Sequence, residues 1–492
     1  MELQDLTIKK FHQGLIDKKF SATEVAKAFF DYIEEKDEKI GAYLRLTKDL
    51  AIDQAKQVDI DVAADKKINI LAGAPLAIKD NILIEGGPTT AASKILENYT
   101  ASYDATVIKK LKDAGVIFMG RTNMDEFAMG SSTESSAFGP TKNPFDLSRV
   151  PGGSSGGSAV AVASGMALGA LGSDTAGSIR QPAAFCGLVG MKPTYGAVSR
   201  YGLMALGSSI DQIGPITKTV EDAEIIFTAI AGADSLDATS VDVSPTEEFS
   251  WPSRPSLRSV RAGENSSVGF TIGVPRDFLS EGVDPEVLKN FEESLEKLRA
   301  AGCKIIDISL PLVKYSLAVY YILMPAEAST NLARYDGMRF GFSAEAPNLL
   351  EVYKKTRGEG FGREVRRRIM LGTYVLSHGY YDAYYNKATA VRGQIKHEFE
   401  KVFEKVDLIA TPTAPTPAFK LGEKIDPVSM YLSDIFTVPA NIADLPAVSV
   451  PTGKNKDGLP LSFQLMASIG GESALFSTAR ILEKYLPAGD LS

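Results

Sequence analysis

A glycine- and serine-rich segment restricts the fold of this chain more than any other part of its sequence. It reads Pro-Gly-Gly-Ser-Ser-Gly-Gly-Ser at 151–158 and Gly-Ser-Asp-Thr-Ala-Gly-Ser at 172–178. Flexible linkers have a similar composition, but they are not followed by an apolar, helix-like run such as 159–170 or by Ile-Arg-Gln-Pro at 179–182. The segment therefore predicts folded turns in which the backbone approaches a neighbouring group closely.

Short apolar segments alternate with helical patterns on both sides of these turns. Ser21 and Glu24 have the spacing of a capping box ahead of a helical repeat, and Asp284-Pro285 is typical of a helix start. A further helix is expected at 105–114. The expected strands are 76–78, 116–119, 270–274, 303–308, 406–410 and 447–450. This alternation predicts an α/β sheet.

The whole chain of 492 residues is expected to form one domain, because the same α/β pattern stands before and after a polar stretch. The expected parts are an N-terminal helical arm (1–65), a catalytic core with the Ser/Gly-rich segment (66–230), a polar surface insertion (234–267) and the remaining α/β core with the substrate pocket (268–492). The alternative is that the polar stretch links two domains.

Charge and cysteine content exclude several classes of function. Lys and Arg total 53 against 61 Asp and Glu, a net charge of -8, so no overall positive field attracts nucleic acid. Two cysteines, Cys186 and Cys303, cannot build a disulfide framework, which favours the cytoplasm. We expect neither a signal peptide nor a membrane span, because no apolar run has the required form or length.

Two common motifs fit the glycine-rich segment only in part. A phosphate-binding loop needs a lysine after its last glycine, and neither Gly157 nor Gly177 is followed by one. Gly-Gly-Ser-Ser-Gly at 152–156 satisfies the G-x-S-x-G pattern, in which Ser154 would be the nucleophile of a hydrolase with a histidine base. This second interpretation depends on a suitable histidine.

Histidines are scarce, and lysine is the usual substitute for a histidine base. His12, His378 and His397 lie in charged or tyrosine-rich helical sequence, and only His378 is a candidate triad member. No cluster has the spacing of a metal site, so none is expected. Lys79 ends the apolar strand pattern 76–78, where it is either buried for catalysis or extends to solvent.

Lys79 and two seryl hydroxyls suggest a proton relay. In this hypothesis Lys79 takes a proton from Ser154, which takes one from the nucleophile Ser178. Ser178 would lie at a helix start near Ile179, where a plain N-cap role is the alternative. The N–H groups expected to form an oxyanion hole belong to Thr175, Ala176, Gly177 and Ser178.

Three segments together, 78–81, 151–159 and 172–182, resemble the signature of the amidase signature family, which uses a Ser-cisSer-Lys triad. The resemblance implies Lys79 as base, Ser154 as the serine of a cis peptide and Ser178 as the acyl-forming nucleophile. It also implies a single large domain with a mixed central β-sheet covered by helices on both faces.

Within that family the chain is similar, over nearly its whole length, to the glutamine-hydrolysing subunits of tRNA-dependent amidotransferases. The segments that carry this similarity are 123–130, 201–215 and 359–382. It implies that ammonia from glutamine converts Glu-tRNA(Gln) to Gln-tRNA(Gln), and leaves Asp-tRNA(Asn) open as a second substrate. The implied assembly is a heterotrimer with the amidotransferase subunits B and C, in which B binds most of the misacylated tRNA and uses ATP and Mg, so that this chain needs no cofactor.

The resemblance also implies two substrate-binding residues, and at one position this chain departs from the family pattern. Arg357 would bind the substrate α-carboxylate and Asp426 its ammonium, although a loop arginine and a turn-forming aspartate are the ordinary alternatives. The family usually has glycine where this chain has Ala176, and alanine would be strained there if its φ were positive. Two other functions stay open: a stand-alone amidase with the same triad, and a non-catalytic scaffold subunit.

Overall fold

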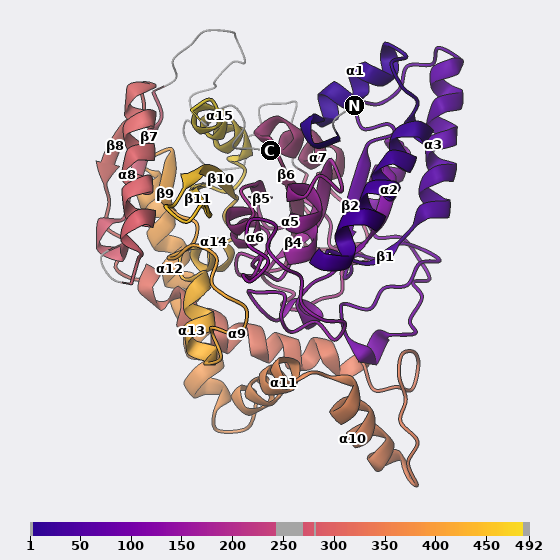
Figure 1. The fold of residues 1–492 in the computed structure, drawn as a ribbon. Coiled ribbons are helices and arrows are strands. Elements are labelled where there is room, and N and C mark those ends of the chain that lie inside the picture. The colour runs from indigo at the N-terminus through magenta and orange to yellow at the C-terminus, as the bar shows by residue number, and fades with distance from the viewer. Residues whose placement is uncertain (1–2, 243–268, 280–281, 486–492) are drawn as a thin grey trace.

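The computed structural model describes residues 3–242, 269–279 and 282–485 (Figure 1). In these residues one 11-stranded sheet has the order β1-β3-β2-β4-β6-β5-β10-β11-β9-β7-β8. The strands are β1 (Tyr43–Leu46), β2 (Pro75–Lys79), β3 (Ile117–Thr122), β4 (Gly169–Asp174), β5 (Val189–Lys192), β6 (Gln212–Thr217), β7 (Thr271–Val274), β8 (Lys304–Asp307), β9 (Leu408–Pro412), β10 (Ala447–Lys454) and β11 (Pro460–Ala467).

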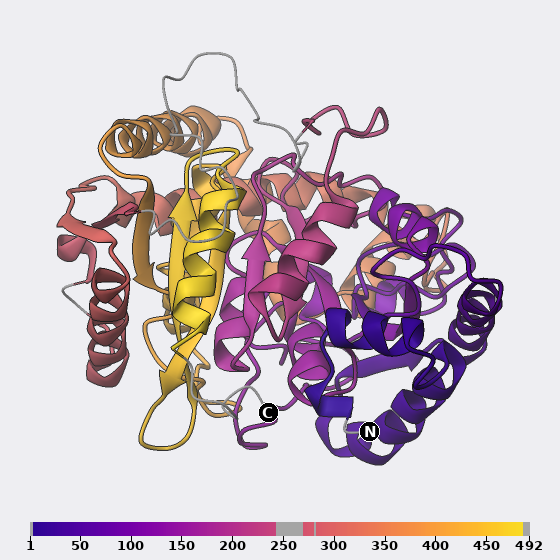
Figure 2. The same ribbon diagram turned by 90° about the horizontal axis from the view of Figure 1, so that it is seen from above.

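Helices lie on both sides of this sheet, as the view in Figure 2 shows. They are α1 (Ile8–Ile16), α2 (Ala22–Ile40), α3 (Lys48–Ala63), α4 (Thr106–Asp113), α5 (Gly156–Ala163), α6 (Arg180–Phe185), α7 (Val220–Ile230), α8 (Pro285–Ala300), α9 (Ser316–Asn331), α10 (Leu349–Gly360), α11 (Arg363–Val375), α12 (Lys387–Phe403), α13 (Pro427–Tyr431), α14 (Val438–Ile442) and α15 (Glu472–Glu483). Helices α9, α10 and α11 run along one end of the sheet, at the bottom of Figure 1.

The sheet is mixed, which confirms the expected fold class. β2 pairs in parallel with β3 and β4, and β7 pairs in parallel with β8 and β9. The strands between these two groups are antiparallel, from β4–β6 through β5–β10 to β11–β9. Strands from before and after residues 243–268 therefore belong to one sheet. Most of the predicted insertion 234–267 lies outside the described residues, and the predicted domain boundaries stay a prediction.

Local signals located most elements correctly and one of them wrongly. The capping box is confirmed, because Ser21 Oγ accepts from Glu24 N and the Glu24 carboxylate accepts from Ser21 N. The apolar run 159–170 is not one helix: α5 ends at Ala163, and Gly165 then takes a positive φ of 71°. The chain re-enters the sheet as β4, which pairs with β2 and β6. Residues 3–65 of the predicted N-terminal arm contain the helices α1, α2 and α3 and the edge strand β1.

Two apolar cores hold the part of the sheet that carries the candidate residues. The first packs α2, α4, α5 and α7 against the central strands, and β2 is buried along its whole length. The second joins α9, α11 and α12 to the segment between β2 and α4 and to the loop that follows β3. The carboxyl end of β2, with Lys79, thus lies in the interior of the molecule, next to the glycine-rich turns.

Candidate active site

Lys79 is completely buried at the end of β2. Its Nζ lies 2.8 Å from Ser154 Oγ, 2.8 Å from Ser155 Oγ, 2.9 Å from Ser173 Oγ and 3.2 Å from the Ser173 carbonyl oxygen. An ammonium has three protons for these acceptors, whereas a neutral amine offers a lone pair to a hydroxyl. Burial lowers the pKa of Lys79 to about 7, although three nearby carboxylates act to raise it. The amine can therefore serve as a base near neutral pH.

Ser154 follows a cis peptide bond with Gly153, which confirms the conformation implied by the family resemblance. A side chain at Gly153 would collide with the carboxylate of Asp125 and come within 2.6 Å of the Ser132 nitrogen. The Asp125 N–H donates to the Ser154 carbonyl at 3.3 Å. The glycine at 153 is thus required by close packing of the cis turn on the loop after β3.

Ser178 lies against the same turn, because its carbonyl accepts from the Ser155 N–H at 3.1 Å. Its side chain is almost buried, with 6 % exposed. In the described part of the chain no group forms a hydrogen bond with Ser178 Oγ, so the contact to Ser154 that the relay requires is not formed here. Ser178 is also not an N-cap, since α6 begins at Arg180 with Ile179 as the preceding residue.

The turn before Ser178 supplies backbone donors, with one correction to the expected set. The Gly177 N–H donates to Asp174 Oδ1 at 2.8 Å and is therefore not a free oxyanion donor. The N–H groups of Thr175, Ala176 and Ser178 have no acceptor among the described residues. Three of the four expected donors thus stay available for a negatively charged oxygen.

Ala176 is not strained by its methyl group. Among the described residues, those with a positive φ do not include Ala176, and the following Gly177 has the φ of 124°. A side chain at Gly177 would collide with Thr437, whose Oγ1 donates to the Ala176 carbonyl at 2.6 Å. The conformation that needs glycine is therefore one position later than the departure from the family pattern.

A buried ion pair holds this turn to the other half of the sheet. Arg180 donates to both carboxylate oxygens of Asp174 at 3.0 Å, and also to Gln464 on β11 and Asn441 on α14 at 2.6 Å. Burial alone would raise the pKa of Asp174, but the Arg180 guanidinium outweighs it and the pKa is about 2. The ionised carboxylate also holds Gly177 and Ile179 N–H groups, so it fixes the shape of the turn.

The two predicted substrate-binding residues lie in different surroundings. Arg357 on α10 is half-buried; its Nη1 donates to the carbonyls of Leu332 (2.8 Å) and Tyr335 (3.0 Å), and its guanidinium lies 5.0 Å from the Phe361 ring. Asp426 is exposed and caps α13 by accepting from the Ser429 N–H at 2.9 Å. A carboxylate in this capping role does not point to a substrate ammonium.

Asp434, at the end of the 3-10 turn that follows α13, is a buried carboxylate that the sequence analysis did not single out. Its side chain is only 5 % exposed, and Oδ2 accepts from Ser131 Oγ at 2.5 Å. Its carbonyl accepts from Thr437 Oγ1, the hydroxyl that also binds the Ala176 carbonyl. Burial raises the pKa of Asp434 to about 7. No motif marks this residue, because the loop reaches the oxyanion turn only through the tertiary fold.

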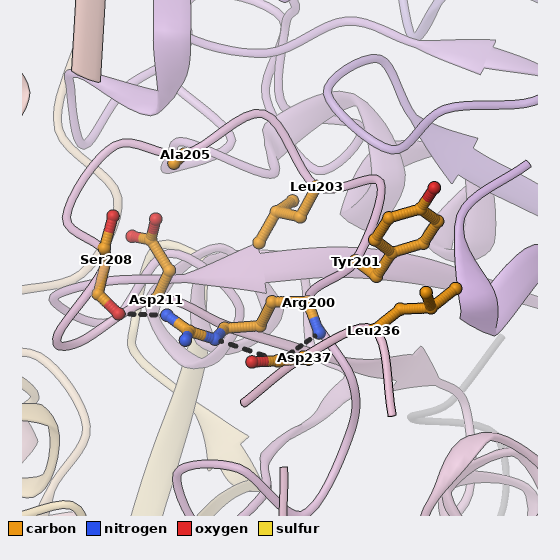
Figure 3. Close-up of a pocket in the computed structure, with 8 residues that line it drawn as sticks. All are labelled: Arg200, Tyr201, Leu203, Ala205, Ser208, Asp211, Leu236 and Asp237. Carbon is orange, nitrogen blue, oxygen red and sulfur yellow. Dashed lines mark hydrogen bonds and ion pairs between the residues drawn. The ribbon is translucent and has the colours of Figure 1, made fainter. Parts of the chain in front are cut away.

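A separate pocket of about 180 Å³ is lined by charged and apolar side chains from residues 200–211 and 236–237 (Figure 3). Arg200 crosses it and forms an ion pair with Asp237 at 3.5 Å. Asp211 lines the same pocket and accepts from the Thr175 hydroxyl at 2.8 Å. The Asp211 carboxylate, whose pKa burial raises to about 6, therefore helps to fix Thr175.

Among the described residues, neither a histidine base nor a metal-binding group is found at the candidate serines. His378 and His397 are exposed and His12 is half-buried on α1, so none of them contacts a candidate serine. Within residues 3–242, 269–279 and 282–485, no three His, Cys, Asp or Glu side chains form a group that could hold a metal ion. In the same ranges, no helix has the length and apolarity to span a membrane.

Comparison with known proteins identifies the family. The family model described as Amidase matches residues 24–476, nearly the entire chain. The chain belongs to the amidase family. Other amidases share the architecture: the structure of a peptide amidase, 27% identical, superposes with a TM-score of 0.79 and covers 98% of this chain and 97% of its own.

Several amidases that are more similar in sequence are named as the A subunits of glutamyl-tRNA(Gln) amidotransferases. The one from Carboxydothermus hydrogenoformans is 54% identical over 98% of both chains, and the one from Trichodesmium erythraeum is 52% identical over 97% of both. The crystal structure of the corresponding Thermotoga maritima protein is 43% identical, has a TM-score of 0.80 and covers 100% of this chain and 97% of its own.

Proposed function

We propose that this amidase is the ammonia-supplying subunit of a tRNA-dependent amidotransferase and hydrolyses glutamine. The similarity to amidotransferase A subunits over 97% and more of each chain supports this specific function over that of a stand-alone amidase. The observation that carries the chemistry is the buried Lys79 amine within 2.8 Å of Ser154 Oγ, beside a turn that ends in Ser178.

The proposed reaction begins with attack of Ser178 Oγ on the side-chain amide carbon of glutamine. The Ser178 proton passes to Ser154, whose own proton passes to the neutral Lys79 amine. The free N–H groups of the oxyanion turn bind the negative oxygen. The intermediate collapses as the relay returns a proton to the leaving nitrogen, and ammonia departs. Water then hydrolyses the seryl ester to glutamate, with Lys79 and Ser154 as the base.

The proposed assembly is a heterotrimer with the amidotransferase subunits B and C in the cytoplasm. The B partner would bind most of the misacylated tRNA and use ATP and Mg to activate it, so that this chain supplies only ammonia. The conversion of Glu-tRNA(Gln) to Gln-tRNA(Gln) follows the names of the relatives. The negative net charge of -8 agrees with a chain that leaves most tRNA contacts to its partner.

Glutamate and ammonia release from glutamine tests the proposal. The purified chain is measured alone and after co-expression with the B and C partners, with and without ATP and misacylated tRNA. We expect release to rise sharply when partners, ATP and tRNA are all present. Release that ignores the partners, or faster turnover of simple aliphatic or aryl amides, would instead assign the chain to the stand-alone amidases.

Replacing Arg357 by alanine is expected to raise the KM for glutamine by about 10- to 100-fold, since a charge-assisted hydrogen bond to the α-carboxylate contributes roughly 1.5–3 kcal/mol. The matched substrate is 4-aminobutanamide, which has the same amide and ammonium but lacks the carboxylate. Its kcat/KM should be the same in both enzymes. Unchanged glutamine kinetics would remove Arg357 from the substrate site.

For the substrate ammonium we propose Asp434 in place of the exposed Asp426, because Asp434 is buried beside the oxyanion turn. Asp434→Asn should raise the KM for glutamine about tenfold or more, and should leave glutaramic acid, which lacks the amino group, unaffected. Asp426→Asn is the matched control and should change neither value, because asparagine also caps helices. The reverse pattern would restore Asp426 to the site.

A further inference from the structure

Two consecutive carboxylates after β3 point in opposite directions. Asp125 contacts the loop 132–135 and the cis turn: its carboxylate accepts from the N–H groups of Thr133 (2.9 Å) and Ser132 (3.2 Å), and its own N–H donates to the Ser154 carbonyl. Glu126 turns the other way, toward the end of α10. A single peptide unit therefore separates the contacts of the cis turn from those of the α10–α11 connection.

The Glu126 side chain binds the backbone of the α10–α11 connection. Both of its carboxylate oxygens accept from the Gly362 N–H, at 2.8 and 3.1 Å, and Gly362 is the N-cap of α11. Ser93 Oγ donates to the same carboxylate and lies 3.3 Å from the Gly360 carbonyl. A Cβ at Gly362 would collide with Glu126. Glutamate at 126 and glycine at 362 are thus fitted to each other.

The connection carries the proposed carboxylate-binding residue. Arg357 lies in the last turns of α10, and Phe361 follows the helix end. The Phe361 ring lies 5.0 Å from the Arg357 guanidinium and 5.7 Å from the ring of Phe127, the residue after Glu126. A shift of the connection would therefore move Phe361 and the arginine together.

We propose that Glu126 is a positioning residue that holds the α10–α11 connection, and with it Arg357, in register with the cis Ser154 turn. The burial of Glu126, which is 2 % exposed, is consistent with this role. Burial of a carboxylate costs free energy unless the carboxylate is fully hydrogen-bonded. Capping of α11 alone would need only a small polar side chain, so it does not explain a buried glutamate at this place. This inference rests on the proposed function, because it needs Arg357 to bind glutamine.

The test is a double-mutant cycle on glutamine kinetics in the assembled enzyme. Glu126→Gln keeps the shape and one acceptor for the Gly362 N–H but no longer accepts with both oxygens. We expect the KM for glutamine to rise about tenfold with kcat changed less than about twofold, since small misplacement of a binding group is costly. In an Arg357→Ala background the same substitution should add no further effect, and 4-aminobutanamide should be unaffected throughout.

Two further variants keep the result interpretable. Ser93→Ala removes only the hydroxyl contact to Glu126 and should raise the KM for glutamine by a smaller factor. This variant tests the inference even if the Glu126 variant fails to fold. Glu398→Gln is the matched control, because both Glu398 oxygens accept from the Leu312 N–H (3.1 and 3.2 Å) in another part of the fold. It should leave KM unchanged.

The outcomes separate this inference from the proposed function. If Arg357→Ala raises KM but Glu126→Gln and Ser93→Ala do not, or if the effects of Arg357 and Glu126 add, the positioning role is wrong and the function stands. A loss of kcat on both substrates would also overturn it, since this pattern indicates a structural or catalytic role. If the wild-type assembly releases no ammonia from glutamine, the proposed function and the inference both fail.

Discussion

Ser178→Ala is expected to lower ammonia release from glutamine by about 10⁶-fold, because no seryl ester can form without the hydroxyl and the remaining groups act as a unit with it. The side chain is almost buried but makes no hydrogen bond among the described residues, so its removal should leave the fold intact. Steady-state release of glutamate and ammonia by the assembled enzyme measures the loss, and thermal unfolding confirms folding.

A matched control lies in the same glycine-rich segment. Ser158 is also buried, but its Oγ contacts Thr122 Oγ1 (2.7 Å) and the Leu171 carbonyl (3.1 Å). Ser158→Ala should lower stability by about 1 kcal/mol, the value of a typical buried hydrogen bond, and keep activity within a few-fold. If Ser178→Ala retained more than a trace of the wild-type activity, Ser178 could not be the nucleophile, and Ser154 would be the next serine to test.

The catalytic turns were predictable from sequence because their constraints are local. The glycines and serines at 151–158 and 172–178 predict close-packed turns on the basis of backbone sterics alone. An apolar run followed by a charged residue predicts the strand that ends at Lys79. Contacts between residues far apart in sequence were harder to predict. Ser155 and Ser173 lie in these turns, but the sequence did not indicate that they accept hydrogen bonds from the Lys79 amine.

The substrate side of the site could not be predicted in the same way. Asp426 caps α13 and Asp434 ends the 3-10 turn after that helix, and only the tertiary fold buries Asp434 against Ser131. The engagement of the Gly177 N–H by Asp174 is also invisible in sequence, since it depends on the ion pair with Arg180. Long-range packing decides the burial of Asp434, whereas the Gly177 contact depends on the local conformation of the turn, since Asp174, Gly177 and Arg180 lie within seven residues.

Packing also explains why the helix expected at 159–170 stops early. Gly165 provides the positive φ that ends α5, after which the chain pairs with β2. Small apolar residues suit a helix and a buried strand equally well, so the local pattern does not distinguish them. Sheet pairing on both sides of β4 then selects the strand.

Lys79→Ala is expected to lower kcat/KM for glutamine by about 10⁴-fold, the upper range for loss of general base catalysis. Lys192→Ala is the matched control: Lys192 is another buried strand lysine, but its Nζ donates to the Pro193 carbonyl at 2.8 Å and to none of the candidate serines. The control should unfold at lower temperature and lose less than tenfold in activity. Equal losses in the two variants would remove Lys79 from the relay.

The pH profile of the wild-type enzyme tests the charge state of the base. Because burial lowers the pKa of Lys79 to about 7, the neutral amine prevails above that pH and the inactive ammonium below it. The kcat/KM should therefore fall tenfold per pH unit below about 7 and level off above it. Asp434, with a pKa of about 7, loses its charge over the same range and steepens the fall for glutamine. Glutaramic acid, which has no ammonium, reports Lys79 alone, so a flat profile with this substrate would contradict a lysine base.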